Sequence, residues 1–180
     1  MLNTDLFTYS GFKEFTDGFT VIVDTREKET DHVLAFFERN HIAYIGRALE
    51  FGDYSAEGNH FSLEHSFCVE RKNSADELRR CMTDPSLRFE TELARARCAG
   101  VQLALVLENT SEQELLAGDP YHSIPPGKLY RQLYFYSCRY GCSYSCIPSR
   151  LSGQIIYNDL LMRCFLLYKS AVYGGSHEKR

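Results

Sequence analysis

The sequence has no long apolar run, no excess of positive charge and no internal repeat or low-complexity segment. Its most apolar stretch, residues 160–168, is interrupted by Arg163 and is far shorter than the roughly 20 residues of a membrane-spanning helix. No basic segment followed by an apolar one opens the chain, so we expect neither export nor membrane insertion. The net charge of −4 argues against a protein that coats nucleic acid by bulk charge, although a local basic face remains compatible with it.

The cysteines are odd in number. Seven cysteines in a chain without an export signal indicate reduced thiols and a cytoplasmic location. Cys138, Cys142 and Cys146 recur every four residues, as zinc ligands can, but the usual second pair is missing. Cys164 or a histidine would have to complete such a site. Buried free thiols are therefore the favoured interpretation.

The composition is that of a folded globular domain. Hydrophobic residues make up 44% and charged residues 24%, and 180 residues can bury a core without disulfides or structural metal. Short β-branched segments alternate with segments of helical period, which predicts a mixed α/β fold with helices on both faces of a sheet. We expect an N-terminal extension at 1–18, one domain at 19–173 and a disordered tail at 174–180. The predicted strands span 19–24, 42–49, 61–70, 101–107 and 143–147, and the predicted helices span 31–40, 74–81, 86–98, 128–140 and 152–173.

Acidic side chains accompany the ends of the first three predicted strands. Asp24 ends the first strand, Asp53 follows the second and Glu70 ends the third. Because neighbouring strands lie about 4.8 Å apart, carboxylates at adjacent strand ends can converge on one cation. Oxygen ligands of this kind suit a hard divalent ion such as Mg²⁺. Two further acids are close in sequence, since Glu27 follows Asp24 by three residues and Asp76 lies one helical turn into the segment after Glu70.

A lysine accompanies the third acid. Lys72 is two residues beyond Glu70, so on one strand both side chains point to the same face. Its ammonium can hold an attacking water or a scissile phosphate beside the ion, which supplies what phosphodiester hydrolysis needs. Arg71 points to the opposite face by alternation, or bends away if the strand has ended. Each acid alone is more simply a solvated strand end or a helix cap, but the ordered combination is harder to explain that way.

Three segments resemble the nuclease domain of the XPF-type structure-specific endonucleases, the excision-repair cross-complementing group-four domain of the restriction-endonuclease-like PD-(D/E)XK superfamily. They are residues 21–27 (VIVDTRE), 51–54 (FGDY) and 69–76 (VERKNSAD), and the Glu-Arg-Lys-x-x-x-Asp pattern of the last is quite specific. Residues 88–96 (RFETELARA) resemble a helix of compact phage and bacterial members. The resemblance has good motif support over 19–108 and continues more loosely toward the C-terminus.

This resemblance implies a restriction-endonuclease-like α/β fold and a Mg²⁺- or Mn²⁺-dependent endonuclease that cuts branched, flapped or junction DNA. It also implies a homodimer, because family members commonly pair through the nuclease domain. By position, Lys72 matches the catalytic lysine, Arg71 the arginine of the same pattern and Asp76 its closing acid. The residues that match metal ligands are Asp24, Asp53 and Glu70, with Glu27 in the same acidic cluster.

The chain leaves no room for the helicase or the tandem helix-hairpin-helix domain of larger family members. Substrate choice then depends on the domain itself or on a separate DNA-targeting partner. A basic DNA-binding face and an ordinary solvated face are equally good interpretations of the arginines on the second and third predicted helices, which are Arg79, Arg80, Arg88, Arg95 and Arg97. Aromatic residues at 130–144 lie near Arg131 and Arg139 and can stack unpaired bases, but packing on the sheet or on a dimer partner is favoured.

The sequence favours an endonuclease acting in recombination, repair or replication, because the set of acids and the lysine is complete. Two alternatives stay open. One is a non-catalytic DNA-binding or scaffold subunit that uses the nuclease fold, and the other is an enzyme that cleaves RNA or unbranched DNA.

Overall fold

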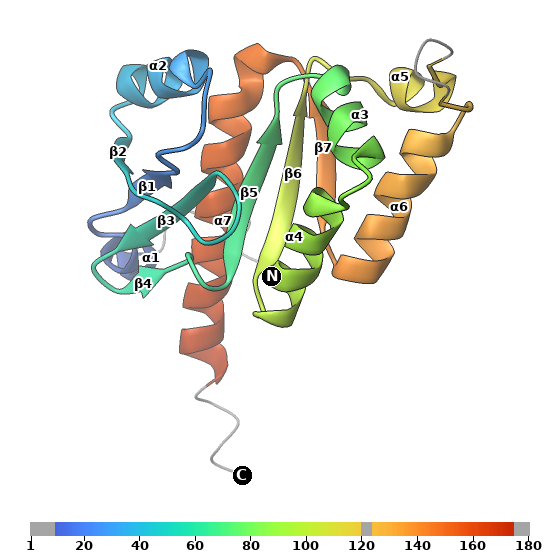
Figure 1. Ribbon diagram of the computed structural model, residues 1–180. Helices are drawn as coiled ribbons and strands as arrows, with labels where there is room; N and C mark the ends of the chain where they lie inside the picture. The colour runs from blue at the N-terminus through green and yellow to red at the C-terminus, as the bar shows by residue number, and fades with distance from the viewer. Residues whose placement is uncertain (1–9, 120–123, 175–180) are drawn as a thin grey trace, which may run out of the picture.

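A computed structural model describes residues 10–119 and 124–174, and its centre is a mixed sheet (Figure 1). Within these residues the sheet has seven strands in the order β2-β1-β3-β5-β6-β7, and β4 pairs with β3 beside this row. The strands are β1 (Thr20–Val23), β2 (Ala43–Gly46), β3 (Tyr54–Gly58), β4 (Phe61–Ser62), β5 (Phe67–Lys72), β6 (Gln102–Glu108) and β7 (Ser143–Ile147).

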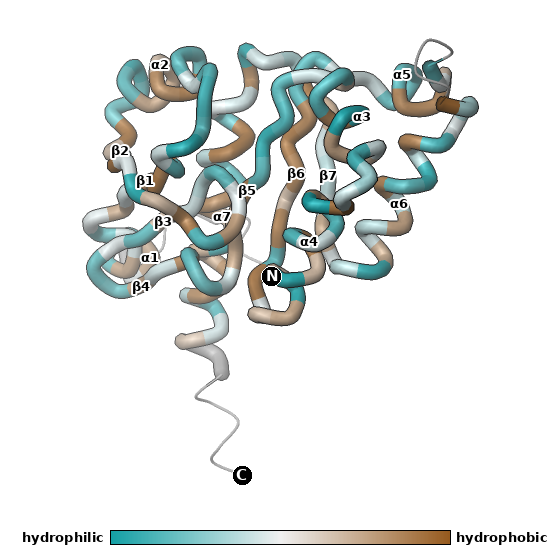
Figure 2. The backbone as a smooth tube through the Cα atoms, in the orientation of Figure 1, coloured by the Kyte–Doolittle hydropathy of each residue, from teal (hydrophilic) through white to brown (hydrophobic). Residues whose placement is uncertain are grey.

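Helices cover both faces of the sheet, which confirms the predicted fold class. One hydrophobic layer contains side chains of α1, α2 and α7, and the other contains side chains of α3, α4, α5 and α6. β6 serves both layers and is apolar along most of its length in Figure 2, since Val106 packs in the first layer and Leu105 in the second. The helices are α1 (Ser10–Phe15), α2 (Asp31–Arg39), α3 (Ala75–Thr83), α4 (Arg88–Cys98), α5 (Glu112–Ala117), α6 (Lys128–Tyr140) and α7 (Ser152–Gly174).

Strand direction brings four chain segments to one edge of the sheet. β5 runs parallel to β6, and β3 lies between β1 and β5 antiparallel to both. The ends of β1, β5 and β6 therefore meet at the same edge as the beginning of β3. Asp24, Asp53, Lys72 and Glu108 are at or next to these four positions, so the topology itself gathers charged residues at this edge.

The strands on either side of residue 60 differ from the prediction. Residues 54–58 form β3, where no strand is predicted, and the predicted strand at 61–70 is divided into β4 and β5 by a turn at 64–66. β3 has no β-branched residue, and its pairing with β1 and β5 sets its conformation in place of intrinsic propensity. β5 also continues through Lys72, two residues beyond its predicted end.

The short helix α1 lies inside the expected N-terminal extension and packs on α7. Phe12 is buried, and its ring centroid is 5.1 Å from that of Phe165 in an edge-to-face contact. Residues 1–9 and the part of the expected disordered tail after Gly174 lie outside the described residues. No helix in the described part of the chain has both the length and the apolar composition that crossing a membrane requires.

Truncation of Leu105 tests whether this residue belongs to the hydrophobic core. Leu105→Ala should lower the free energy of unfolding by about 2–5 kcal/mol, because the residue is 1% exposed and its truncation leaves a cavity between β6 and the helices. Leu166→Ala on α7 removes the same atoms from a residue that is 49% exposed, and should change that free energy by less than about 0.5 kcal/mol. Urea unfolding of both variants measures the difference, and equal losses would contradict the assignment.

Candidate active site

Asp53 is held between β1 and β5 by backbone contacts. Gly52 has φ +66°, and a Cβ atom there would lie 2.9 Å from Val69 O, so this close approach to β5 requires glycine. The Asp53 N–H donates to Val69 O at 2.8 Å, and the Asp24 N–H donates to Asp53 O at 2.8 Å. The Asp53 carboxylate is thereby held against β5, where Oδ2 accepts the Arg71 N–H at 2.8 Å.

Glu70 and Lys72 point to the same face of β5, as their spacing predicts. Both are buried, and Lys72 Nζ donates to Glu70 Oε1 at 2.5 Å. Nζ also lies 5.2 Å from the ring centroid of Phe89 on α4 and 3.8 Å from Glu77 Oε1 on α3. Burial lowers the pKa of Lys72, but the charges of Glu70 and Asp53 outweigh it and raise that pKa, so the ammonium stays protonated at neutral pH.

Arg71 points the other way and is 4% exposed. Its Nε donates to Glu27 Oε1 at 2.7 Å, Nη1 donates to Glu108 Oε2 at 3.0 Å, and Nη2 donates to Lys28 O at 2.6 Å. Nη2 also forms an ion pair with Glu27. The side chain therefore ties the loop after β1 to the end of β6. A polar cavity of about 310 Å³ lies beside it and is lined by Arg26, Glu27, Lys28, Glu29, Arg71, Asn73 and Glu77.

The Asp24 carboxylate is fully occupied by hydrogen bonds. Oδ1 accepts the N–H of Arg26 at 2.7 Å and its Nε–H at 2.9 Å. Oδ2 accepts Arg26 Nη2 at 2.8 Å and the Leu49 N–H at 2.7 Å. Burial alone would raise the pKa of Asp24, but these hydrogen bonds and the Arg26 charge lower it. Asp24 is thus ionised and already neutralised by an arginine.

Ionisation of Asp53 carries an electrostatic cost. Burial, followed by the charges of Glu70 and Glu27, raises the pKa of Asp53 well above its usual value, and Lys72 offsets only part of that rise. Glu92 on α4 has a raised pKa for the same reasons, with burial first and Glu70 second. Glu92 is not among the site residues predicted from the sequence. The sequence feature that could have identified it is its position three residues after Phe89, on the side of α4 that contacts Lys72.

The donor set fits a hard divalent cation at Asp53 and Glu70. Among the described residues, no donor reaches Asp53 Oδ1 or Glu70 Oε2, and carboxylate oxygens are the preferred ligands of such ions. The same part of the chain contains no group of three His, Cys, Asp or Glu side chains that could hold a metal ion. Asp24 and Glu27, which the resemblance assigns to the ion, bind Arg26 and Arg71 instead.

The other predicted site residues on α3 lie apart from this group. The Asp76 side chain is 73% exposed and forms an ion pair with Arg79, whose Nε also lies 3.6 Å from Asp119 Oδ2. Arg80 is exposed on the same helix. The cysteine series does not converge either, because Cys142 is buried whereas Cys138 is exposed.

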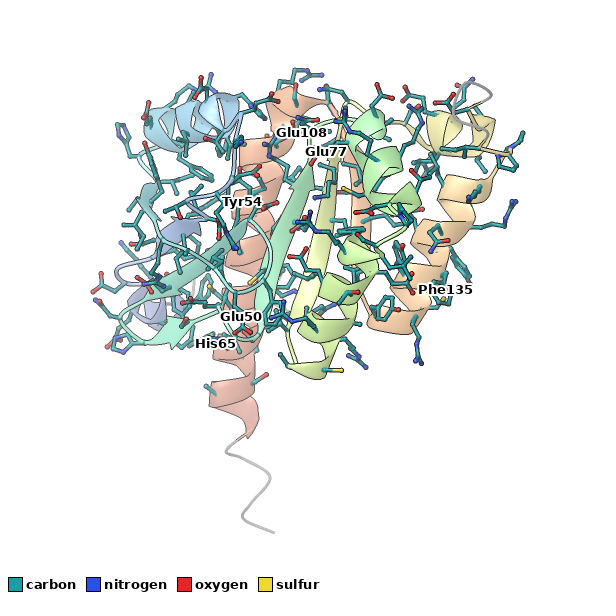
Figure 3. The ribbon with its side chains drawn as sticks, viewed as in Figure 1. Glu50, Tyr54, His65, Glu77, Glu108 and Phe135 are labelled. Atoms are coloured by element: carbon teal, nitrogen blue, oxygen red, sulfur yellow. The ribbon has the colours of Figure 1, made fainter. Side chains whose placement is uncertain are left out.

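Of two exposed arginines on α4, Arg95 lies beside the turn that places Asp53. Arg88 and Arg95 are two turns apart on the helix that carries Glu92. The Arg95 guanidinium lies 3.5 Å from Glu50 and 5.5 Å from the Phe51 ring, directly before the turn that places Asp53. Figure 3 shows Glu77 and Glu108 at the edge where β5 and β6 end, while Phe135 points outward from α6.

A mixed sheet lies between two helical layers, with an acid and a lysine two residues apart on a central strand, which is the α/β architecture that the resemblance implies. The chain belongs to the ERCC4 domain family, whose model matches residues 23–158. Nucleases of the XPF family are metal-dependent. No curated protein matches the chain.

Solved structures show the same fold. XPF from Aeropyrum pernix superposes with a TM-score of 0.60 at 19% identity, over 79% of this chain and 65% of that one. XPF from Aeropyrum pernix in complex with DNA gives a TM-score of 0.55 at 20% identity, over 80% and 63% of the two chains. This chain therefore spans slightly less than two thirds of either structure.

The raised pKa of Asp53 predicts that removing its charge stabilises the metal-free protein. A carboxyl with a raised pKa in the folded state binds protons more readily there than in the unfolded state, so the fold loses stability as pH rises above 3.8 toward that pKa. At pH 8, Asp53→Asn should raise the melting temperature by roughly 2–4 °C, for a gain of about 1 kcal/mol.

Calorimetry in EDTA at pH 5 and pH 8 measures this effect. The gain of the variant over the natural protein should be larger at pH 8, because Asp53 is more fully ionised there. A larger gain at pH 5 would contradict the direction of the pKa shift.

Proposed function

We propose that this protein is a Mg²⁺- or Mn²⁺-dependent endonuclease that hydrolyses phosphodiester bonds in branched, flapped or junction DNA, in recombination, repair or replication. The observation that carries the proposal is the joint placement of Asp53, Glu70 and Lys72 at one edge of the sheet, with carboxylate oxygens that no described donor occupies. Membership of the ERCC4 domain family supports it, and so does the likeness to an XPF that was solved in complex with DNA.

Asp53 and Glu70 would hold the divalent ion, and Asp24 and Glu27 would join it only after leaving their arginines. Such an ion, once bound, makes a water more acidic and neutralises charge on the phosphate. Lys72 adds a positive charge beside the same carboxylates, and its contacts with Glu70 and Phe89 fix the ammonium before substrate arrives. Its raised pKa makes Lys72 a source of charge and not a proton acceptor.

The DNA backbone would bind along α4. Arg95 is exposed beside the Asp53 turn and Arg88 is exposed on the same helix two turns away, so both can contact phosphates near the scissile bond. A second copy of the chain is the partner proposed for the outer side of α6, where Tyr134 is 63% and Phe135 47% exposed. A separate DNA-targeting protein would supply the junction recognition that these few arginines do not.

A non-catalytic DNA-binding subunit is the second candidate. It is favoured by one observation, namely that Asp24 and Glu27 are engaged by arginines, so the four predicted acids do not form a ready metal site among the described residues.

Cleavage assays separate the two candidates. The purified protein is incubated with labelled flap, fork, four-way and linear DNA, and with linear RNA, in Mg²⁺, Mn²⁺ or EDTA. We expect metal-dependent cutting of branched DNA, lowered about 100- to 1,000-fold in Lys72→Ala because a fixed positive charge at the reacting phosphate is lost. Lys13→Ala, which removes an exposed lysine on α1, is the matched control and should cut normally. Junction binding without cutting in any metal would favour the scaffold, and faster cutting of RNA or linear DNA would correct the substrate.

The arginines on α4 should set DNA affinity independently of catalysis. In the Lys72→Ala background, Arg88→Ala with Arg95→Ala should weaken binding of a labelled fork and lower the salt dependence of log K by about 2, since each phosphate contact contributes about 0.9. Arg39→Ala on α2 removes an exposed arginine from the opposite helical layer and serves as control. Fluorescence anisotropy between 50 and 200 mM salt measures both slopes, and identical slopes would remove α4 from the interface.

A further inference from the structure

Glu108 is a buried carboxylate with no role in the site as proposed so far. It is the last residue of β6 and is 1% exposed, at the edge where β6 ends (Figure 3). Lys72 ends the parallel strand β5 opposite Leu107, directly before Glu108. Burying a carboxylate costs free energy unless it has charged or hydrogen-bonding partners. Glu108 has two, because Oε2 accepts Arg71 Nη1 at 3.0 Å and Oε1 accepts His32 Nε2 at 2.8 Å.

Each guanidinium nitrogen of Arg71 has a hydrogen-bond acceptor. Nε donates to Glu27, Nη1 to Glu108 and Nη2 to the Lys28 carbonyl, so the acceptors come from the loop after β1 and from the end of β6. The side chain is 3% exposed, so its charge faces these acceptors and not the solvent. A phosphate would have to displace one of them to reach Arg71 directly.

The backbone of Arg71 connects this ion network to the metal-binding carboxylates. The Arg71 N–H donates to Asp53 Oδ2 at 2.8 Å, and Glu27, on the Arg71 side chain, is one of the charges that raise the pKa of Asp53. A movement of Arg71 therefore changes both the position and the electrostatic surroundings of Asp53. His32 extends the network to α2, on the other side of the sheet from α4.

We propose that Glu108 is a positioning residue, backed by His32, which fixes the Arg71 guanidinium and through it the Asp53 carboxylate that would bind the ion. Arg71 then holds Asp53 in place and does not contact the phosphate. The proposal rests on the proposed function for its effect on cleavage. Its effect on Arg71 itself can be measured without any metal or DNA.

The first experiment is NMR of the Arg71 Nε–H in metal-free protein. The natural protein should show a resolved, slowly exchanging signal, because Nε is buried and bound to Glu27. Glu108→Ala should speed its exchange at least tenfold, and Glu108→Gln, which keeps an acceptor, should do so less. Glu64→Ala is the matched control, because it removes a carboxylate from a different arginine, Arg47, outside the site. Unchanged exchange in folded Glu108→Ala would overturn the proposal even if the enzyme is inactive.

The second experiment measures function in two ways. In the Lys72→Ala background, Mn²⁺ affinity by electron paramagnetic resonance should fall about 10-fold in Glu108→Ala, the lower end of what residues that orient metal ligands contribute. In otherwise natural protein, kcat should fall about 10- to 100-fold while KM for a fork changes less than threefold. His32→Ala should show a smaller loss, restored by His32→Gln, which can still donate to Glu108.

The separate effects of Glu108→Ala on kcat and on KM distinguish two roles for Arg71, which are holding Asp53 in place and binding the phosphate. A rise in KM with unchanged kcat in Glu108→Ala would indicate that Arg71 binds the phosphate. That result would overturn the proposal that Arg71 only holds Asp53 in place. A protein that neither cuts DNA nor binds Mn²⁺ but shows the NMR effect would retain the Arg71 network and refute only the proposed function.

Discussion

The close approach of the Gly52–Asp53 turn to β5 is the constraint on which the candidate site depends. A side chain at position 52 would collide with the Val69 carbonyl, so glycine alone lets the chain enter between β1 and β5 there. That entry starts β3 antiparallel to both neighbours and leaves Asp53 at the edge where β1 and β5 end. The position of an acid that lies far in sequence from Glu70 is thus decided by backbone packing and not by side-chain attraction.

Alternation along β5 then divides the charged residues between two environments. Glu70 and Lys72 face α4, where an aromatic ring and a further acid surround the ammonium. Arg71, between them, faces the loop after β1 and the end of β6, where three acceptors hold it. One strand therefore presents a pair that is available for chemistry on one side and a fixed ion network on the other. The two are linked because the backbone of Arg71 binds Asp53.

Short-range sequence rules could predict the parts of the site that lie within one strand. The same-face placement of Glu70 and Lys72 needs only their spacing, and the amphipathic helices needed only their period. Glu108 could not be found this way, since one acid after an apolar run looks like an ordinary solvated strand end. Asp24 shows a different limit, because Arg26, two residues away, binds the carboxylate that convergence at the edge predicts as an ion ligand. β3 escaped prediction because its strand partners, and not its own residues, determine it.

The charges that remain unbalanced indicate where a ligand belongs. Asp24 and Glu27 are each bound by an arginine, and Glu70 is bound by Lys72. Among the described residues, Asp53 accepts a hydrogen bond from one backbone N–H and is near two other acids, so the fold keeps its charge at a cost that an asparagine of the same shape would avoid. A cation bound between Asp53 and Glu70 would relieve that repulsion, whereas a purely structural role gives no reason for it. Because the cost is local to Asp53, the candidate site is best regarded as a single strained carboxylate supported by already satisfied ion pairs, and not as a symmetrical cluster of equivalent acids.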